Sequence, residues 1–239
     1  MASAIIIAGG GGTRTEQFVP KQFLTVNDIP VIIYTMMNIQ KNDNVDDIIV
    51  VCSQGWENFV YMYAKQFGVS KLKEVVTGGD TRAASICNGL CAIKDGEEDQ
   101  KVLLVDANRP LIPQSVINEV IMLVDNCDCA GGMVPCYDSM FVSADEQVVT
   151  DVVERAELYR GVGPECARLD TLRELYTPDK ITDAKDASAT GLAICYGKKV
   201  RMAKGHVKCF KITTADDFEL FKAFLAAEPL ANITRRDAQ

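Results

Sequence analysis

Four consecutive glycines, at positions 9–12, directly follow the apolar run AIIIA and constrain this chain more than any other feature. An apolar run that ends in glycines is typical of a buried strand whose following turn approaches a phosphate, because glycine has no Cβ to obstruct the approach. Arg14 and Lys21 add two cations to the same segment. The alternative is a tight strand-to-helix turn with solvated charges.

The residues around the glycines distinguish three kinds of phosphate-binding loop. A mononucleotide P-loop needs a lysine followed by a hydroxyl residue directly after its last glycine, and GGGGTRT lacks this pair. A dinucleotide-binding loop needs a third glycine where Arg14 stands, counting from Gly9 and Gly11, which disfavours an NAD(P)-dependent dehydrogenase without excluding it. The third kind is a glycine-rich turn followed by an arginine and a distant PKQ, in which amides and cations neutralise a triphosphate.

Short apolar runs alternate along the chain with longer amphipathic stretches. The runs near residues 4, 47 and 101 are rich in Val, Ile and Leu and indicate buried parallel strands. Helical spacing is found between and after them, in residues 30–42, 56–68, 82–93 and 113–127. This alternation predicts an α/β fold with a doubly wound, mostly parallel sheet, which binds ligands at the carboxyl ends of its strands.

The pattern changes to β-type between residues 134 and 153, around the polar sequence SADEQ. It predicts a protruding β-hairpin arm at about residues 134–157. An extended hairpin usually needs a partner surface, so we expect a dimer contact; an ordinary sheet edge is the alternative. Without repeats or linkers, we interpret residues 1–239 as a single domain with this arm.

Composition and charge argue against several classes of function. The net charge of −8 and the lack of a basic cluster disfavour nucleic acid or an anionic membrane as a partner. No run approaches the roughly 18 apolar residues of a membrane span. The nine cysteines form no CxxC pair and no export signal is apparent, so we expect reduced thiols and a cytoplasmic location. His206 is the one histidine, which disfavours zinc and histidine-dependent triads and suggests a surface or helix-end role.

Three further motifs carry polar groups suited to a nucleotide site. GGDTRAAS, from Gly78, places glycines at the start of a helix, where the backbone can approach a base. VDANRP ends a buried strand with Asp106, where doubly wound sheets hold metals or sugar hydroxyls. CFKITTADDF places Lys211 at the end of a predicted late strand.

In this order, the motifs GGGGTR…PKQF, GGDTRAAS, DANRP, PCYDSM, VVERAELYRGVGPE and FKITTADDF resemble the cytidylyltransferases that make CDP-polyols. That family includes methylerythritol phosphate cytidylyltransferase of isoprenoid synthesis and ribitol-5-phosphate cytidylyltransferase of wall and capsule synthesis. The resemblance runs from Ala4 to about Ala226. It implies a Rossmann-like nucleotidyltransferase fold and transfer of CMP from CTP to a polyol phosphate, with release of pyrophosphate.

The resemblance also implies roles at the nucleotide. Arg14 and Lys21 match the cations that contact the triphosphate and stabilise the transition state. The residues expected around the nucleotide are Ala8, Gly9, Gly10, Gly12, Gly79, Asp80, Ser85 and Ala107, the last near the ribose. Magnesium is the implied cofactor, with Asp106 as the acid near Mg²⁺.

On the acceptor side, the resemblance implies that Asp106, Arg109 and Ser139 contact the polyol phosphate. Arg155 and Lys211 match the cations that hold its phosphate, and they complete the expected catalytic set. In the family, the counterpart of Arg155 is delivered by the arm of a neighbouring subunit, which implies a homodimer.

Several positions depart from the family's pattern. Val105 replaces a usual histidine and Lys208 replaces an acid, which leaves room for a changed acceptor. PKQF and Trp56 look more like the ribitol-phosphate branch, so ribitol 5-phosphate is the expected acceptor and methylerythritol phosphate the alternative. A nucleotide-binding paralogue without turnover, or a dehydrogenase, is the alternative from another class.

Overall fold

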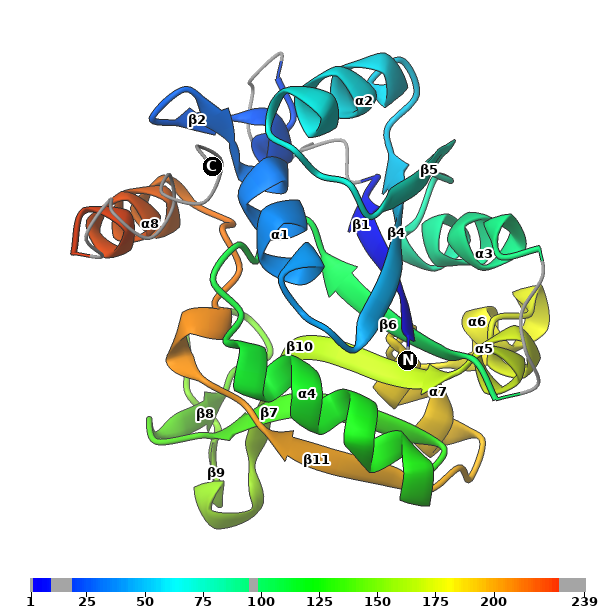
Figure 1. Cartoon of the computed structure of the whole chain (residues 1–239). Coiled ribbons are helices and arrows are strands. Elements are labelled where there is room, and N and C mark those ends of the chain that lie inside the picture. The colour runs from blue at the N-terminus through cyan, green and yellow to red at the C-terminus, as the bar shows by residue number, and fades with distance from the viewer. Residues whose placement is uncertain (1, 10–18, 95–98, 228–239) are drawn as a thin grey trace.

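The computed structural model describes residues 2–9, 19–94 and 99–227, and its centre is a seven-stranded mixed sheet (Figure 1). The strand order is β11–β7–β10–β6–β1–β4–β5. All neighbouring pairs are parallel except those that β10 makes with β6 and β7. The prediction of a mostly parallel sheet is confirmed. The strands are β1 (Ala2–Ala8), β4 (Val45–Cys52), β5 (Leu72–Thr77), β6 (Lys101–Asp106), β7 (Cys129–Pro135), β10 (Tyr159–Arg168) and β11 (Val200–Lys204).

Helices cover both faces of the sheet, because side chains of the central strands point alternately to two cores. In β1, Ile6 joins the core beneath α1, α2 and α4, whereas Ile5 and Ile7 join the core beneath α3, α5 and α7. The four predicted helices are confirmed. The helices are α1 (Val31–Gln40), α2 (Glu57–Gln66), α3 (Arg82–Ala92), α4 (Gln114–Leu123), α5 (Leu169–Leu175), α6 (Pro178–Asp183), α7 (Ala189–Cys195) and α8 (Ala215–Ala227).

Short elements connect this framework. β2 (Thr25–Val26) and β3 (Ile29–Pro30) form a small hairpin, whose turn residues Asn27 and Asp28 both have positive φ. The 3-10 helices are η1 (Lys21–Phe23), η2 (Val124–Asn126), η3 (Arg155–Glu157) and η4 (Val207–Cys209).

The predicted arm is present as a hairpin of β8 (Met140–Val142) and β9 (Asp151–Val153), which pair antiparallel apart from the main sheet. It connects β7 to β10 and projects beside them in Figure 1. Large apolar side chains are exposed on it, including Phe141 at 60% and Val152 at 62%. The hairpin therefore leaves an apolar surface unburied within one chain.

The prediction that Lys211 ends a late strand is wrong. β11 ends at Lys204, and η4 separates it from the segment that carries Lys211. That segment instead pairs with the turn after β6, where the Asn108 side chain donates to Ile212 O and Ile212 N donates to Asn108 O. Ile212 of this segment packs in the core beneath α1 and α8.

The carboxyl ends of four parallel strands are level with one another. Ile7 lies opposite Asp106 in the β1–β6 pair, and Cys52 lies opposite both Ala8 and Thr77. Gly9, the GGDTRAAS motif and the DANRP motif therefore lie at the same edge of the sheet. This edge is where a doubly wound sheet binds ligands.

Helix α3 carries part of this edge, and its position depends on Gly89. A Cβ there would lie 2.8 Å from Ile5 Cγ2 and 2.9 Å from Val51 Cγ2. Alanine favours a helix by about 1 kcal/mol over glycine, but overpacking costs about 1–3 kcal/mol. The two effects together predict that Gly89→Ala lowers the free energy of unfolding by up to about 2 kcal/mol, measured by urea titration. The exposed control Cys91→Ala on the same helix should change it by less than about 0.5 kcal/mol; equal effects would contradict this packing account.

Candidate functional site

The backbones of two glycine-containing segments touch at the ends of β1 and β5. A Cβ at Gly9 would lie 2.6 Å from Ser85 Oγ, and one at Gly78 would lie 3.2 Å from Gly9 Cα. Gly79 N donates to Ser85 Oγ at 3.2 Å. Side chains at these glycines would separate the segments, so glycine is needed there for close approach. The structure thus brings together Gly9, Gly79 and Ser85, with Ala8 just before Gly9 and Asp80 exposed just after Gly79.

Lys21 occupies the first position of η1, beyond the glycine-rich segment. Its ammonium group donates to the carbonyl oxygen of Thr213, just before α8. The Asp217 carboxylate holds this segment by accepting from Thr213 N at 2.8 Å. Lys21 is thereby anchored to the segment that carries Lys211. Gly10, Gly12 and Arg14 lie outside the described residues.

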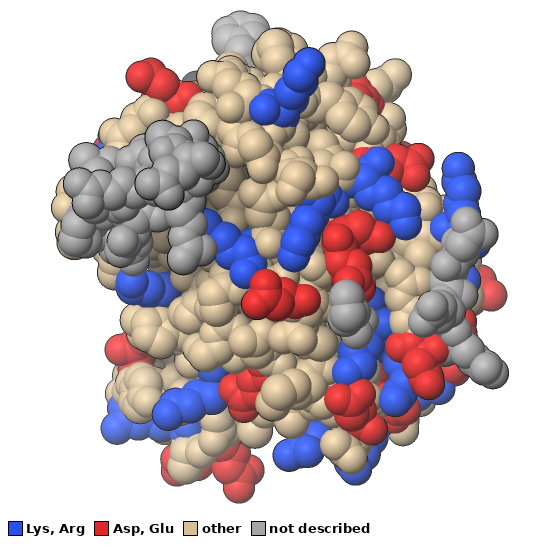
Figure 2. Space-filling model, in the orientation of Figure 1, with Lys and Arg blue, Asp and Glu red and all other residues tan. Residues whose placement is uncertain are grey.

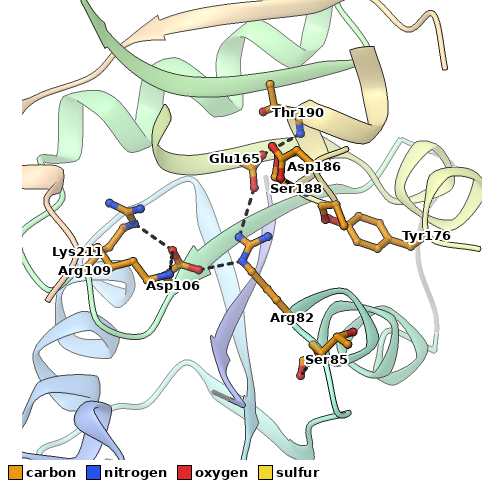
Figure 3. A network of polar contacts seen from close by, with 12 residues as sticks. Arg82, Ser85, Asp106, Arg109, Glu165, Tyr176, Asp186, Ser188, Thr190 and Lys211 are labelled. Carbon is orange, nitrogen blue, oxygen red and sulfur yellow. Dashed lines mark hydrogen bonds and ion pairs between the residues drawn. The ribbon is translucent and has the colours of Figure 1, made fainter. Parts of the chain in front are cut away.

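The Asp106 carboxylate accepts from three cations that come from three separate segments (Figure 3). Arg82 Nε lies 3.2 Å from Oδ1 of Asp106. On the other oxygen, Oδ2, Arg109 Nε and Lys211 Nζ lie at 3.1 Å and 3.2 Å. Arg109 also donates to Cys209 O at 2.5 Å, which fixes the segment before Lys211. The predicted trio of Asp106, Arg109 and Lys211 is therefore assembled, with Arg82 added. Ala107, next in the chain, is buried.

A second carboxylate holds the far side of Arg82. Glu165 of β10 is buried, and its Oε2 lies 3.4 Å from Arg82 Nη2. Its Oε1 accepts from Thr190 N of α7 at 2.8 Å. Arg82 therefore lies between two carboxylates, and the guanidinium is fixed at both ends, as Figure 3 shows.

The charges around Asp106 shift its ionisation strongly. Burial alone would raise the pKa of the Asp106 carboxyl, but Arg82, Lys211 and Arg109 outweigh burial and hold that pKa well below its usual value. Burial would likewise lower the pKa of Arg82, but Asp106 and Glu165 more than offset it and raise that pKa. These shifts keep Asp106 and Arg82 charged at neutral pH. Three basic side chains face two carboxylates here, and this excess of basic groups suits an anion.

A cleft of about 550 Å³ opens beside this network. Glycine backbone of β7 and β10 forms one part of its wall, and polar side chains near the start of α7 form another. Its polar side chains are those of Arg82, Asp106, Arg109, Tyr159, Glu165, Asp186, Ser188 and Thr190. The cleft thus combines cations with hydrogen-bonding groups, which is the chemistry that a phosphorylated polyhydroxyl compound requires.

The two predicted arm residues are not brought to this cleft within one chain. Ser139 and Arg155 are both exposed. Arg155 Nη1 donates to Tyr137 O at 2.7 Å, a contact inside the arm itself.

The sequence interpretation missed Arg82 and Glu165, although each left a signal. Arg82 is the first residue of α3, after the N-cap Thr81. A cation is unfavourable at this end of a helix dipole, so an arginine there needs another partner. Glu165 is a charged residue in an otherwise buried stretch of β10, and buried carboxylates are usually paired.

The two positions that depart from the family's pattern, Val105 and Lys208, do not line the cleft. Val105 is buried in the core under α1 and α4, and Lys208 Nζ lies over the Phe224 ring of α8. His206 Nδ1 accepts from Lys208 N and caps η4, so its predicted helix-end role is confirmed.

The described part of the chain shows no disulfide, no candidate metal cluster and no candidate membrane span. All nine cysteines are free. Among residues 2–9, 19–94 and 99–227, no three His, Cys, Asp or Glu side chains are placed to hold a metal, and no helix is long and apolar enough to cross a membrane. On the face in Figure 2, acidic and basic side chains of the described residues are interspersed.

Comparison with known proteins gives consistent results along the chain. Residues 2–227 match the model of the family described as 2-C-methyl-D-erythritol 4-phosphate cytidylyltransferase (IspD). A ribitol-5-phosphate cytidylyltransferase of Lacticaseibacillus paracasei is 32% identical, over 96% of this chain and all of that protein. A 2-C-methyl-D-erythritol 4-phosphate cytidylyltransferase of Clostridium novyi is 29% identical, over 93% and 95% of the two chains. The crystal structure of 4-diphosphocytidyl-2C-methyl-D-erythritol synthase from Anaerococcus prevotii superposes on this chain with a TM-score of 0.80 and 22% sequence identity. The match covers 94% of this chain and 98% of that protein.

The Asp106 network makes a prediction about stability and pH. Asp106→Asn leaves three cations without their shared carboxylate and should cost about 3 kcal/mol of unfolding free energy at pH 7. Because the folded-state pKa of Asp106 is lowered, its contribution is complete above the unfolded-state pKa of about 4 and is lost as the pH falls towards the folded-state pKa. The gap between wild type and variant, measured by urea unfolding, should therefore shrink between pH 5 and pH 3.

The matched control is Glu219→Gln, which removes an exposed ion pair with Lys222. It should change the unfolding free energy by less than about 0.5 kcal/mol at each pH. A gap for Asp106→Asn that stays constant or widens on acidification would contradict the assignment.

Proposed function

The chain belongs to the 2-C-methyl-D-erythritol 4-phosphate cytidylyltransferase (IspD) family and is a cytidylyltransferase, and we propose that its acceptor is ribitol 5-phosphate. The reaction would form CDP-ribitol and pyrophosphate from CTP. The observation that carries the proposal is the group of three cations that Asp106 holds beside a polar cleft. The match of residues 2–227 supports treating the chain as one nucleotidyltransferase domain.

The chemistry requires positioning and charge neutralisation rather than a covalent enzyme intermediate. An oxygen of the acceptor's phosphate attacks the α-phosphorus of CTP. The bond from that phosphorus to the oxygen bridging to the β-phosphorus breaks, and pyrophosphate leaves with the electron pair. We propose that Lys21 and Arg14 neutralise the triphosphate as charge builds on it. The base would lie against Gly9, Gly79 and Ser85, whose close approach leaves backbone groups to read its edge.

The acceptor would occupy the 550 Å³ cleft. Arg82, Arg109 and Lys211 offer the positive charge that its phosphate needs, and Asp106 fixes all three at 3.1–3.2 Å. Because the cations already share a carboxylate, they are oriented before the substrate arrives, which lowers the cost of binding. Polyol hydroxyls would find acceptors and donors in Asp186 and Ser188, which line the same cleft.

The choice between acceptors rests on sequence similarity and one contact. The relative named for ribitol 5-phosphate is 32% identical, compared with 29% for the relative named for methylerythritol phosphate. The two features that suggested the ribitol branch, Phe23 in PKQF and Trp56, stack on each other with ring centroids 4.0 Å apart. Methylerythritol phosphate remains the second candidate, because it names the family.

We propose that Mg²⁺ arrives on the triphosphate of CTP. Magnesium commonly binds through substrate phosphates, water and one or two carboxylates. Asp106 can offer one carboxylate, but both of its oxygens already accept from cations. These residues therefore fit a metal held mainly by the nucleotide, where it would neutralise the leaving pyrophosphate.

We also propose a homodimer formed through the arm, in which Ser139 and Arg155 of one subunit reach the cleft of the other. The exposed apolar side chains of the arm support this, since a surface of this kind usually has a partner. Arg155 is exposed and would be available to such a partner.

The nine free cysteines support our placing of the enzyme in the cytoplasm.

The first test is a panel of acceptors with CTP and Mg²⁺, in which pyrophosphate release is followed. We predict the highest kcat/KM with ribitol 5-phosphate, about tenfold or more above methylerythritol phosphate, as differences in hydrogen-bonded substrate groups commonly produce. The reverse order would assign the chain to the methylerythritol branch. No release with any acceptor would refute turnover.

The second test addresses the shared site. Lys21→Ala should lower kcat by about two to three orders of magnitude, because it removes a positioned charge at the transition state. Arg155→Ala should mainly raise the KM of the acceptor. At acceptor concentrations well below the raised KM, mixed dimers of the two variants should regain activity, because one of their two sites would combine an intact Lys21 with an intact partner arm. Mixtures no more active than the parents would contradict delivery across the dimer.

A further inference from the structure

The connection from β4 to α2, residues 53–56, contacts three segments that surround the proposed nucleotide site, together with Glu57, the first residue of α2. Ser53 Oγ donates to Gly9 O at 3.3 Å, at the end of β1. Glu57 accepts from Thr77 Oγ1 at 2.7 Å, at the end of β5. Trp56 stacks on Phe23 of η1 with ring centroids 4.0 Å apart and planes 15° apart. One connection thus holds the strand end before the glycines, the turn that carries Lys21 and the strand end before Gly78.

The contact with η1 matters most, because this element cannot fix itself. It is a single 3-10 turn of three residues, and isolated turns of this length are not stable alone. Lys21 begins the turn and Phe23 ends it, with Phe23 only 6% exposed. Between them, the Gln22 side chain donates to Ala8 O at 2.6 Å. The position of Lys21 therefore depends on how its two neighbours are held, and the Trp56 ring covers one of them.

Trp56 is itself well supported. Its other neighbour is Phe59, one turn along α2, at 5.1 Å between centroids. The turn around Trp56 is held by Glu57. Oε2 of Glu57 accepts a hydrogen bond from Gly55 N at 2.8 Å. Gly55 has a φ of +88°, a conformation that L side chains rarely adopt. The ring is thus presented by a fixed turn and a helix rather than by a free loop.

We propose that Trp56 is a positioning residue for the transfer reaction, which acts by holding the Phe23 end of η1 and thereby placing the Lys21 ammonium for the triphosphate. The proposal rests on the proposed function, in which Lys21 neutralises CTP. It assigns Trp56 no contact with substrate. Its effect on catalysis must therefore pass through Lys21.

A double-mutant cycle tests this dependence. Trp56→Leu should lower kcat/KM for CTP about tenfold in the wild-type background, since small misplacements of catalytic groups have effects of this order or larger. Trp56→Phe, which can still stack, should recover most of the loss. In a Lys21→Ala background, Trp56→Leu should change kcat/KM by less than about twofold, because the group that it positions is gone.

Two further variants serve as a second test of the stack and as a control. Phe23→Leu removes the other ring of the stack and should match Trp56→Leu in the same cycle. Tyr63→Leu disrupts a second stacked pair on α2, with Phe67 at 6.4 Å, and should leave kcat/KM within about twofold of wild type. Equal losses from Trp56→Leu with and without Lys21, or a loss from Tyr63→Leu as large as that from Trp56→Leu, would overturn the proposal.

The same cycle is run on the dissociation constant of CTP, measured by calorimetry without acceptor. A protein that binds CTP but releases no pyrophosphate would refute the proposed function, while non-additive effects on CTP affinity would still support the role of Trp56. Additive effects on affinity together with additive effects on turnover, or no binding of CTP at all, would overturn it.

Discussion

The ion pairs of Asp106 organise this site, because they join three segments that the sequence separates widely. Arg82 begins α3, Arg109 lies in the turn after β6, and Lys211 lies between η4 and α8. A buried carboxylate is costly unless it is paired and hydrogen-bonded, and three cations are costly unless a carboxylate separates them. Each group is therefore held in place by the others. Glu165 extends the network to β10 and α7 through Arg82 and Thr190.

This arrangement suits a reaction between two phosphorylated substrates. Both substrates carry negative charge, so the enzyme must bring like charges together before any bond forms. Cations fixed in advance by a carboxylate do not have to reorganise when substrate binds, which is the main electrostatic advantage of a preformed site. In the proposed function, the close backbone approach at Gly9 and Gly78 would serve the other substrate by placing two segments against its base. The two halves of the proposed site meet at the level carboxyl ends of β1 and β6.

Much of this could be predicted from the sequence, for identifiable reasons. Strand and helix periodicity predicted the alternating elements, the strand-end position pointed to Asp106, and the family resemblance added Arg109 before their contacts were known. Arg82 and Glu165 were missed because their pairing is long-range. Asp106 lies 24 positions after Arg82 and Glu165 lies 83 positions after it, and no local pattern encodes such pairs. The prediction of a strand ending at Lys211 was wrong for a related reason, because the partner of this segment is the distant turn at Asn108. Trp56 was noted as a mark of the ribitol branch, but its stacking on Phe23 required the fold.

The central claim is that the cations around Asp106 bind the acceptor so that its phosphate, rather than water, attacks CTP. Phosphorus NMR of the products from CTP, Mg²⁺ and ribitol 5-phosphate tests it most directly. The account predicts paired signals of an unsymmetrical diphosphate diester, which grow together with the signal of inorganic pyrophosphate as CTP and ribitol 5-phosphate decline. Conversion of CTP to CMP or CDP, with the acceptor's phosphate signal unchanged, would contradict it.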